Sequence, residues 1–163
     1  MTAWIGIALS VTSLLVAKTA LASPPVGPRD AVEAAVTHFM NITQNGRPDA
    51  AVGGERAEQI RQIVREMFDF DEISRRALSR YWEAIPREQQ VEFVTLFRDL
   101  LERAYLTQIE AARGEKIAFL GESMEGGAAT VRSKVVTRQG TEIPLDYRLH
   151  VRDGRWRIYD VVI

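Results

Sequence analysis

The chain has 163 residues, of which 46% are hydrophobic and 26% are charged. This length and composition are typical of a single globular domain and argue against a disordered or fibrous chain. The sequence contains no cysteine, which excludes disulfides, thiolate nucleophiles and cysteine-based zinc sites. The formal net charge of -1 gives no basic surface, so no nucleic-acid partner is expected. The two histidines, His38 and His150, are too few for a histidine-rich metal site, and no metal is expected.

The N-terminus has the pattern of a secretory signal peptide. Residues 4–17 form an uncharged apolar run, shorter than the roughly 20 residues that span a bilayer. An Ala-x-Ala cleavage pattern, Ala20-Leu21-Ala22, follows it. We therefore expect residues 1–22 to be cleaved after Ala22 and residues 23–163 to form one exported domain. An uncleaved N-terminal anchor is the alternative, because the residues before the apolar run contain no Lys or Arg.

Helical periodicity dominates the first part of the mature chain. Gly46 and Pro48 end the first expected helix, Asp69 or Asp71 is placed to cap the third, and Pro86 is favourable at the start of the fourth. The fourth helix carries two adjacent apolar stripes, which give it one wide apolar face. The expected helices cover residues 29–44, 55–67, 72–82 and 87–113.

After Gly114 the apolar period changes from 3.6 to 2, which indicates strands. Gln139-Gly140 and Asp153-Gly154 have the composition of hairpin turns. The expected strands cover residues 116–120, 128–138, 141–152 and 155–163. Helices followed by an antiparallel meander predict an α+β domain of the NTF2-like or cystatin-like type. Its N-terminal helices would pack on one face of a curved sheet of about four strands, with an apolar pocket between helices and sheet and a charged face in water.

No catalytic signature occurs in the sequence, such as G-x-S-x-G, H-E-x-x-H or a P-loop. His150 is expected on the solvated face of its strand, and His38 at the boundary of its helix. The carboxylates Asp69, Asp71 and Glu72 are better explained by helix capping and solvation than by a bound cation.

Asp160 is the carboxylate that is hardest to assign. Strict alternation along the last strand would point it inward beside Tyr159, where a buried carboxylate could act as a general base. A bulge that turns Asp160 outward, or pairing with an arginine, is the interpretation that we favour.

The apolar residues of the fourth helix and of the sheet fit two arrangements. They could form a closed core, or they could line a lipid pocket between the helix and the sheet. The candidate lining residues are Phe93, Phe97, Leu100, Leu101, Tyr105, Val131, Val135, Leu145, Tyr147, Leu149, Trp156 and Ile158.

Several phrases, in this order along the chain, resemble the MlaC family, also called toluene-tolerance auxiliary proteins. They are Phe68-Asp69-Phe70, Leu78-Ser79-Arg80-Tyr81-Trp82, Pro86 with Gln89, Phe93, Phe97, Leu100-Leu101 and Tyr105, Ile143-Pro144-Leu145-Asp146-Tyr147-Arg148 and Trp156-Arg157-Ile158-Tyr159-Asp160-Val161-Val162. The resemblance covers roughly residues 30–163. It implies a periplasmic carrier that holds a phospholipid by its acyl chains, with no catalysis and no cofactor.

The resemblance also implies partners. The carrier would shuttle lipid between an outer-membrane lipoprotein complex and an inner-membrane ABC transporter with an MCE-domain subunit, maintaining the lipid asymmetry of the outer membrane. We expect a monomer, and a hopanoid-like cargo stays open beside a phospholipid. Two other functions stay open: a small-molecule enzyme with Asp160 or Asp146 as general base, and an adaptor that docks membrane complexes. Family members continue into a further helix, whereas this sequence stops at Ile163; either it is truncated or this member lacks that helix.

Overall fold

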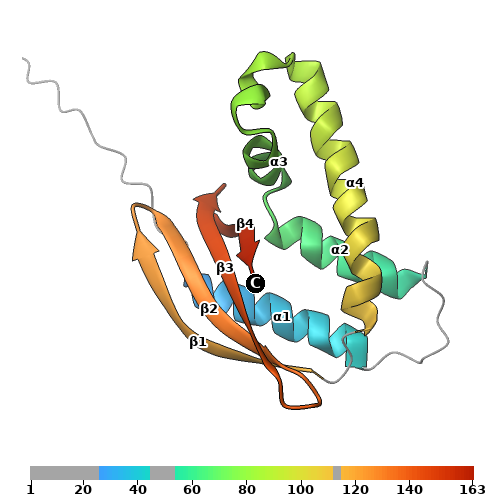
Figure 1. Ribbon diagram of the computed structural model, residues 1–163, viewed down its shortest axis with the longest axis vertical. Helices are drawn as coiled ribbons and strands as arrows, with labels where there is room; N and C mark the ends of the chain where they lie inside the picture. Colours follow the sequence, from blue (N-terminus) through green and yellow to red (C-terminus); the bar gives the residue numbers. More distant parts are fainter. Residues whose placement is uncertain (1–25, 45–53, 112–114) are drawn as a thin grey trace, which may run out of the picture.

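The computed structural model describes residues 26–44, 54–111 and 115–163. The expected signal peptide, the helix-ending turn at residues 45–48 and the expected end of the fourth helix at Arg113 lie outside the described residues. Helices come first and strands second, as the α+β prediction requires (Figure 1). The elements are α1 (Pro28–Gln44), α2 (Glu55–Met67), α3 (Phe70–Leu78), the 3₁₀ helix η1 (Ser79–Ala84), α4 (Arg87–Ala111), β1 (Lys116–Glu125), β2 (Ala128–Val136), β3 (Glu142–Arg152) and β4 (Arg155–Val162).

The predictions of the first, second and fourth helices are confirmed, and the prediction of the third is wrong in its second half. Asp69 is the N-cap of α3, since its side chain accepts a hydrogen bond from the backbone N–H of Glu72. The α-helix then ends at Leu78, because Ser79 adopts a positive φ of 49° that an α-helix cannot continue through. The chain up to Ala84 is a 3₁₀ helix instead.

The four strands form one antiparallel sheet in the order β1-β2-β3-β4, which confirms the meander. Strand β1 is longer than predicted and reaches Glu125 rather than Leu120. The reason is a register shift between Phe119 and Gly121, where one extra residue is absorbed and pairing with β2 resumes. Strand β2 ends at Val136, earlier than the predicted Arg138, because the backbone from residue 137 to 140 closes a turn.

One face of the sheet packs against α1 and forms the main core (Figure 1). Val32 of α1 and Val131 and Leu149 of the sheet are fully buried at its centre. At one end of this layer, the indole N–H of Trp156 donates to the backbone carbonyl of Val26 at 3.1 Å. At the edge formed by β4, Phe68 bridges Ile158 in parallel, so the link between α2 and α3 covers that edge.

The remaining helices form what we call the helical arm, which consists of α3, η1 and α4 (residues 70–111). In Figure 1, α3 and α4 lie side by side, η1 joins them at their far end, and most of α4 lies apart from the sheet. The molecule therefore has a sheet layer with a packed core and an arm that α2 connects to it.

Candidate functional site

The sheet-side candidates for a lipid pocket lie together. Val131, Tyr147, Leu149, Trp156 and Ile158 are buried in one cluster beneath α1, and Leu145 packs against that cluster. The core-facing side of the sheet is less covered at the end where Val135 of β2 pairs with Ile143 of β3. Val135 is half-buried and Ile143 is exposed. The structure thus gives most of these residues a core position and leaves the end near Ile143 more open.

The α4 candidates are not part of that cluster. Phe93, Phe97, Leu100, Leu101 and Tyr105 are absent from the main core, although the rings of Phe93 and Phe97 stack at a centroid distance of 5.2 Å. Leu100 has 60% of its surface exposed and Tyr105 has 54%. The structure does not bring the two halves of the predicted pocket into one packed group.

A further apolar residue on α4 was missed by the sequence analysis. Leu96 is 62% exposed, and it is spaced three and four residues from its apolar neighbours, which places them on one helix face. That spacing was the signal that could have identified it. We define the α4 ridge as Phe93, Leu96, Phe97 and Leu100.

A charged cluster ties α4 to α2. The carboxylate of Glu102, almost buried, accepts two hydrogen bonds from Arg65 at 2.9 and 3.0 Å. Arg61 and Arg98 lie within 3.9 and 3.8 Å of the same carboxylate. The hydrogen bond to Glu102 raises the pKa of the Arg65 guanidinium. Because a two-pronged arginine–carboxylate pair fixes orientation as well as distance, this cluster sets where α4 stands relative to α2.

A polar pair lies inside the apolar face of the sheet. The hydroxyl of Ser133 donates to the backbone carbonyl of Leu145 at 2.5 Å. Burial raises the pKa of the neighbouring Tyr147 phenol to about 12, an effect that a hydrogen bond with Ser133 partly offsets. The core therefore contains two hydroxyls that are hydrogen-bonded, as buried hydroxyls must be to avoid a desolvation cost.

His150 lies on the face of β3 opposite the core, as expected, but it is half-buried rather than fully solvated. Its Nε2 lies 2.8 Å from the Oδ2 of Asp69, whose side chain is buried, and its ring contacts Tyr159 edge-on. Arg152 binds the other oxygen of Asp69 and also pairs with Asp71 at 2.9 Å. These contacts fasten the start of the helical arm to β3. His38, expected at a boundary, is exposed on α1.

The three carboxylates considered for a cation are bound by arginines. Asp69 and Asp71 share Arg152, as described above, and Glu72 accepts hydrogen bonds from Arg75 and Arg76. The hydrogen bond from Arg75 lowers the pKa of Glu72 to about 2, and that from Arg76 acts in the same direction. Within residues 26–44, 54–111 and 115–163, no group of acidic or histidine side chains has the arrangement of a metal site.

The favoured interpretation of Asp160 is confirmed. The pairing of β3 with β4 shifts register between Arg148 and Leu149, so that Arg148 lies opposite Asp160 and Leu149 opposite Ile158. This bulge places Asp160 on the face opposite the core, where it pairs with Arg148 at 3.1 Å. Asp146, the other candidate base, lies opposite Arg132 in the strand register and is half-buried.

The family model described as MlaC protein matches residues 33–163. The chain belongs to the MlaC family. Among solved structures it is similar to the phospholipid-binding protein from Ralstonia solanacearum in complex with a phospholipid, with a TM-score of 0.74 and 25% identity over 85% of this chain and 78% of that one.

Other similarities are more distant. A putative NTF2-like transpeptidase from Campylobacter jejuni aligns with a TM-score of 0.36 and 14% identity over 64% of this chain and 97% of that one, which is too low to carry an argument. No curated protein matches the chain significantly. The order of helices and strands, and the likeness to the Ralstonia protein, confirm the α+β fold for this MlaC-family chain.

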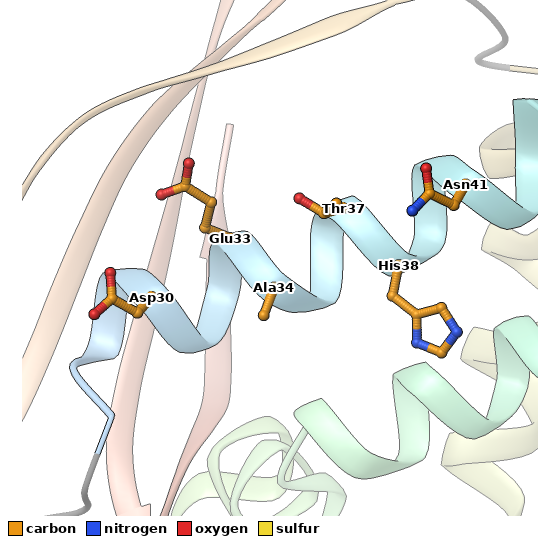
Figure 2. A pocket seen from close by; sticks show the side chains of 6 residues that line it. All are labelled: Asp30, Glu33, Ala34, Thr37, His38 and Asn41. Carbon is orange, nitrogen blue, oxygen red and sulfur yellow. The ribbon is translucent and has the colours of Figure 1, made fainter.

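Two open hollows flank α1 of this MlaC-family chain. The first, of about 520 Å³, is lined by residues of α1 alone, and Figure 2 shows Asp30 and Glu33 among them. The ring of His38 extends toward α2 (Figure 2), and a second hollow of about 500 Å³ lies between the two helices there. Both are open to solvent, and most of the residues that line them have polar side chains. Among the described helices, none combines the length and the apolar character that crossing a bilayer requires.

Proposed function

We propose that this protein binds a phospholipid in the periplasm and carries it between membrane complexes. The observation that carries the proposal is the α4 ridge, an apolar helix face that the described residues leave partly uncovered. Leu96 and Leu100 are each more than half exposed, one helical turn apart, beside the stacked Phe93 and Phe97. Contiguous exposed apolar surface of this kind marks a site for a lipid or a partner rather than a random feature of a surface.

Energetics support acyl chains as the occupant. Each methylene that leaves water contributes about 0.8 kcal/mol, so a 16-carbon chain gains on the order of 12 kcal/mol. We infer that the acyl chains lie along the α4 ridge and reach the more open end of the sheet near Val135 and Leu145. The other candidate lining residues stay predictions. Because Val131 and Leu149 are already buried in the core, the lipid would contact them only if the helices moved.

A binding protein accounts for the charged groups better than an enzyme does. Asp160 is not buried, and its pairing with Arg148 makes it a structural group. His150 and Asp69 are a carboxylate–histidine pair, but Arg152 occupies the second oxygen and the pair joins two elements of the fold. In both arrangements an arginine already occupies the carboxylate, so neither carboxylate is free to take a proton from a substrate.

The finer parts of the proposal rest on family membership. We infer export through the signal peptide at residues 1–22, exchange of lipid with an outer-membrane lipoprotein complex and with an inner-membrane ABC transporter carrying an MCE-domain subunit, and a role in outer-membrane lipid asymmetry. The Ralstonia protein, whose structure contains a phospholipid, supports a phospholipid rather than a hopanoid as the cargo.

Native mass spectrometry of the protein purified from cells, followed by lipid extraction, tests the proposal. We expect a bound mass that fragments as a glycerophospholipid. Leu100→Asp should remove it, because the charge would have to be desolvated beside the acyl chain. The leucine is exposed, so the variant should remain folded, and circular dichroism checks this.

Leu120→Asp is the matched control. Leu120 is 61% exposed and lies on β1, away from α4, so this variant should keep its lipid. A folded Leu100→Asp protein with unchanged lipid occupancy would contradict the site. Protein from cells that never contains phospholipid would contradict the function.

A further inference from the structure

The two edge strands of the sheet, β1 and β4, differ in whether another segment pairs with them. At the β4 edge, Phe68 bridges Ile158, and the backbone N–H of Asp69 donates to the carbonyl of Ile158 at 2.8 Å. At the other edge, β1 pairs with β2 on one side, and no described element pairs with its second side (Figure 1). An unpaired strand edge of this length is a row of free backbone donors and acceptors.

The β1 edge also exposes large apolar side chains. Leu120 and Met124 are 61% and 59% exposed. Between them is Gly121, which has a φ of +150° at the register shift and open space around it where a side chain would be. The edge therefore exposes one large apolar side chain at its bulge and another beyond it, with open space beside Gly121 that a neighbouring side chain can fill.

We propose that β1 pairs with β1 of a second copy of this chain, antiparallel, about a two-fold axis between Leu120 and Gly121. The two strands then join two four-stranded sheets into one continuous sheet. Leu120 of one copy lies opposite Gly121 of the other, where no side chain competes with it. Two-fold symmetry makes each such contact occur twice.

The bulge is what permits this register. Before it, the residue on the inner face is Ile117, opposite Val135; after it, the residue on that face is Met124, opposite Ala129. The extra residue changes the inner-face positions from odd to even numbers. An antiparallel pairing of Ile117 with Met124 of the second copy therefore keeps both side chains on the same face, and the other pairs match in the same way.

Charge supports the same register. Lys116 at one end of β1 lies opposite Glu125 of the second copy, and symmetry gives two such opposite-charge pairs. A parallel arrangement would instead place Lys116 against Lys116. Glu122 lies opposite Phe119 of the second copy, but its carboxylate already accepts a hydrogen bond from the backbone N–H of Arg29 at the start of α1, at 2.8 Å. The one remaining acid on the edge thus has a partner within its own chain.

An interface made of one strand pair and a few side chains is small, so the association should be weak and depend on concentration. Sequence alone led us to expect a monomer, and the open edge is the reason to propose otherwise. Other occupants of this edge, such as an extended segment of a different protein, predict a chain that stays monomeric when pure.

Sedimentation velocity of the purified chain over a hundredfold range of concentration tests the proposal. The wild type should shift from monomer to dimer. Lys116→Glu and Glu125→Lys should each weaken dimerisation about tenfold, because each makes two like-charge pairs. The double variant should restore it, since it exchanges the signs. Arg155→Glu, a charge reversal on β4 at the far edge, is the control and should leave dimerisation unchanged.

Cross-linking tests the register separately, because the chain has no cysteine of its own. Leu120→Cys places two thiols beside the two-fold axis and should form a disulfide dimer under mild oxidation. Lys116→Cys places them at opposite ends of the strand pair, about 30 Å apart at 3.3 Å per residue, and should not. A wild type that stays monomeric throughout, a swapped double variant that does not recover, or cross-linking through Lys116→Cys but not Leu120→Cys would overturn the proposal.

Discussion

The sheet layer and the helical arm contain similar apolar side chains but bury them very differently. In the sheet layer, Leu149 is completely buried against α1 and its strand neighbours. In the arm, Leu96 and Leu100 of α4 remain mostly exposed although they are the same residue type. A helix face can thus be apolar for a reason other than core packing, and here the exposed face is the candidate site for a lipid.

The connections between the two regions explain how such a difference persists. The arm is held to the sheet layer by charge: Asp69 with His150 and Arg152 at its start, and Glu102 with Arg65 farther along. Directional pairs of this kind fix the position of an element without covering its apolar face. The sheet layer thus has a buried apolar core, whereas the arm, whose buried residues include Trp82 and Ser74, is positioned largely by oriented polar contacts.

The largest difference in unfolding free energy is expected when a leucine is truncated to alanine in each of the two regions. Leu149→Ala should lower the free energy of unfolding by about 2–5 kcal/mol, because it leaves a cavity in a packed core. Leu100→Ala should change it by less than about 0.5 kcal/mol, since an exposed side chain loses little on truncation. Urea titrations followed by circular dichroism measure both. Comparable losses for the two variants would mean that α4 packs against the core in solution.

A substitution at Asp69, where the arm contacts the sheet layer, should lower the free energy of unfolding almost as much. Asp69→Asn keeps the shape of the side chain but removes the charge that Arg152 and His150 face, and it should cost about 2–4 kcal/mol of unfolding free energy. Asp71→Asn is the matched control. Its carboxylate is exposed and shares the same arginine, so the loss should stay below about 1 kcal/mol. Equal effects of the two substitutions would show that burial of Asp69 contributes nothing.

The sequence predicted the sheet layer much better than it predicted the arm. Period-2 patterning identified the inward positions Tyr147, Leu149 and Ile158, because alternation along a strand directly states which side faces the core. The same pattern failed at β1, where a bulge at Gly121 extends the strand, since a single glycine signals a stop and a bulge equally well. It placed His150 on the correct face but did not reveal its partner Asp69, which is distant in sequence.

For the arm, helical periodicity correctly predicted which residues of α4 share a face, but it did not predict what that face contacts. Phe93, Phe97 and Leu100 do share a face of α4, yet amphipathicity says that a face is apolar and not what covers it. The break at Ser79 was missed because its positive φ follows from how the arm turns, not from the residue type. Tertiary contacts such as Glu102 with Arg65 set the position of α4, and no local pattern contains them.

Acid should weaken the arm through the carboxylate of Glu72, which lies on α3. The pKa of Glu72 falls from its ordinary 4.5 to about 2 in the folded protein because Arg75 and Arg76 bind it. A lowered pKa means that the stabilisation is complete above about pH 5 and is lost as the pH falls toward 2. Glu72→Gln should remove an acid-labile contribution on the order of 2 kcal/mol. The measurement is unfolding free energy against pH, where the variant should show a flatter slope in this range. Identical slopes would assign the acid sensitivity to other carboxylates.

The smallest expected effect on stability comes from removing one buried serine hydroxyl in each region. Ser133, in the sheet layer, donates to the carbonyl of Leu145, whereas Ser74, on α3, is fully buried and its hydroxyl has no partner among the described residues. Burying an unpaired hydroxyl costs about 1–3 kcal/mol, and removing it recovers part of that cost.

Ser74→Ala should therefore stabilise the protein by about 1 kcal/mol, helped by the better helix propensity of alanine. Ser133→Ala should destabilise it by a similar amount, because Tyr147 and the Leu145 carbonyl lose a partner. Thermal unfolding of the two variants side by side gives opposite shifts in Tm if the contrast is real. A loss of stability in both would mean that Ser74 finds a hydrogen-bond partner in solution, and that α3 is seated as completely as the strands are.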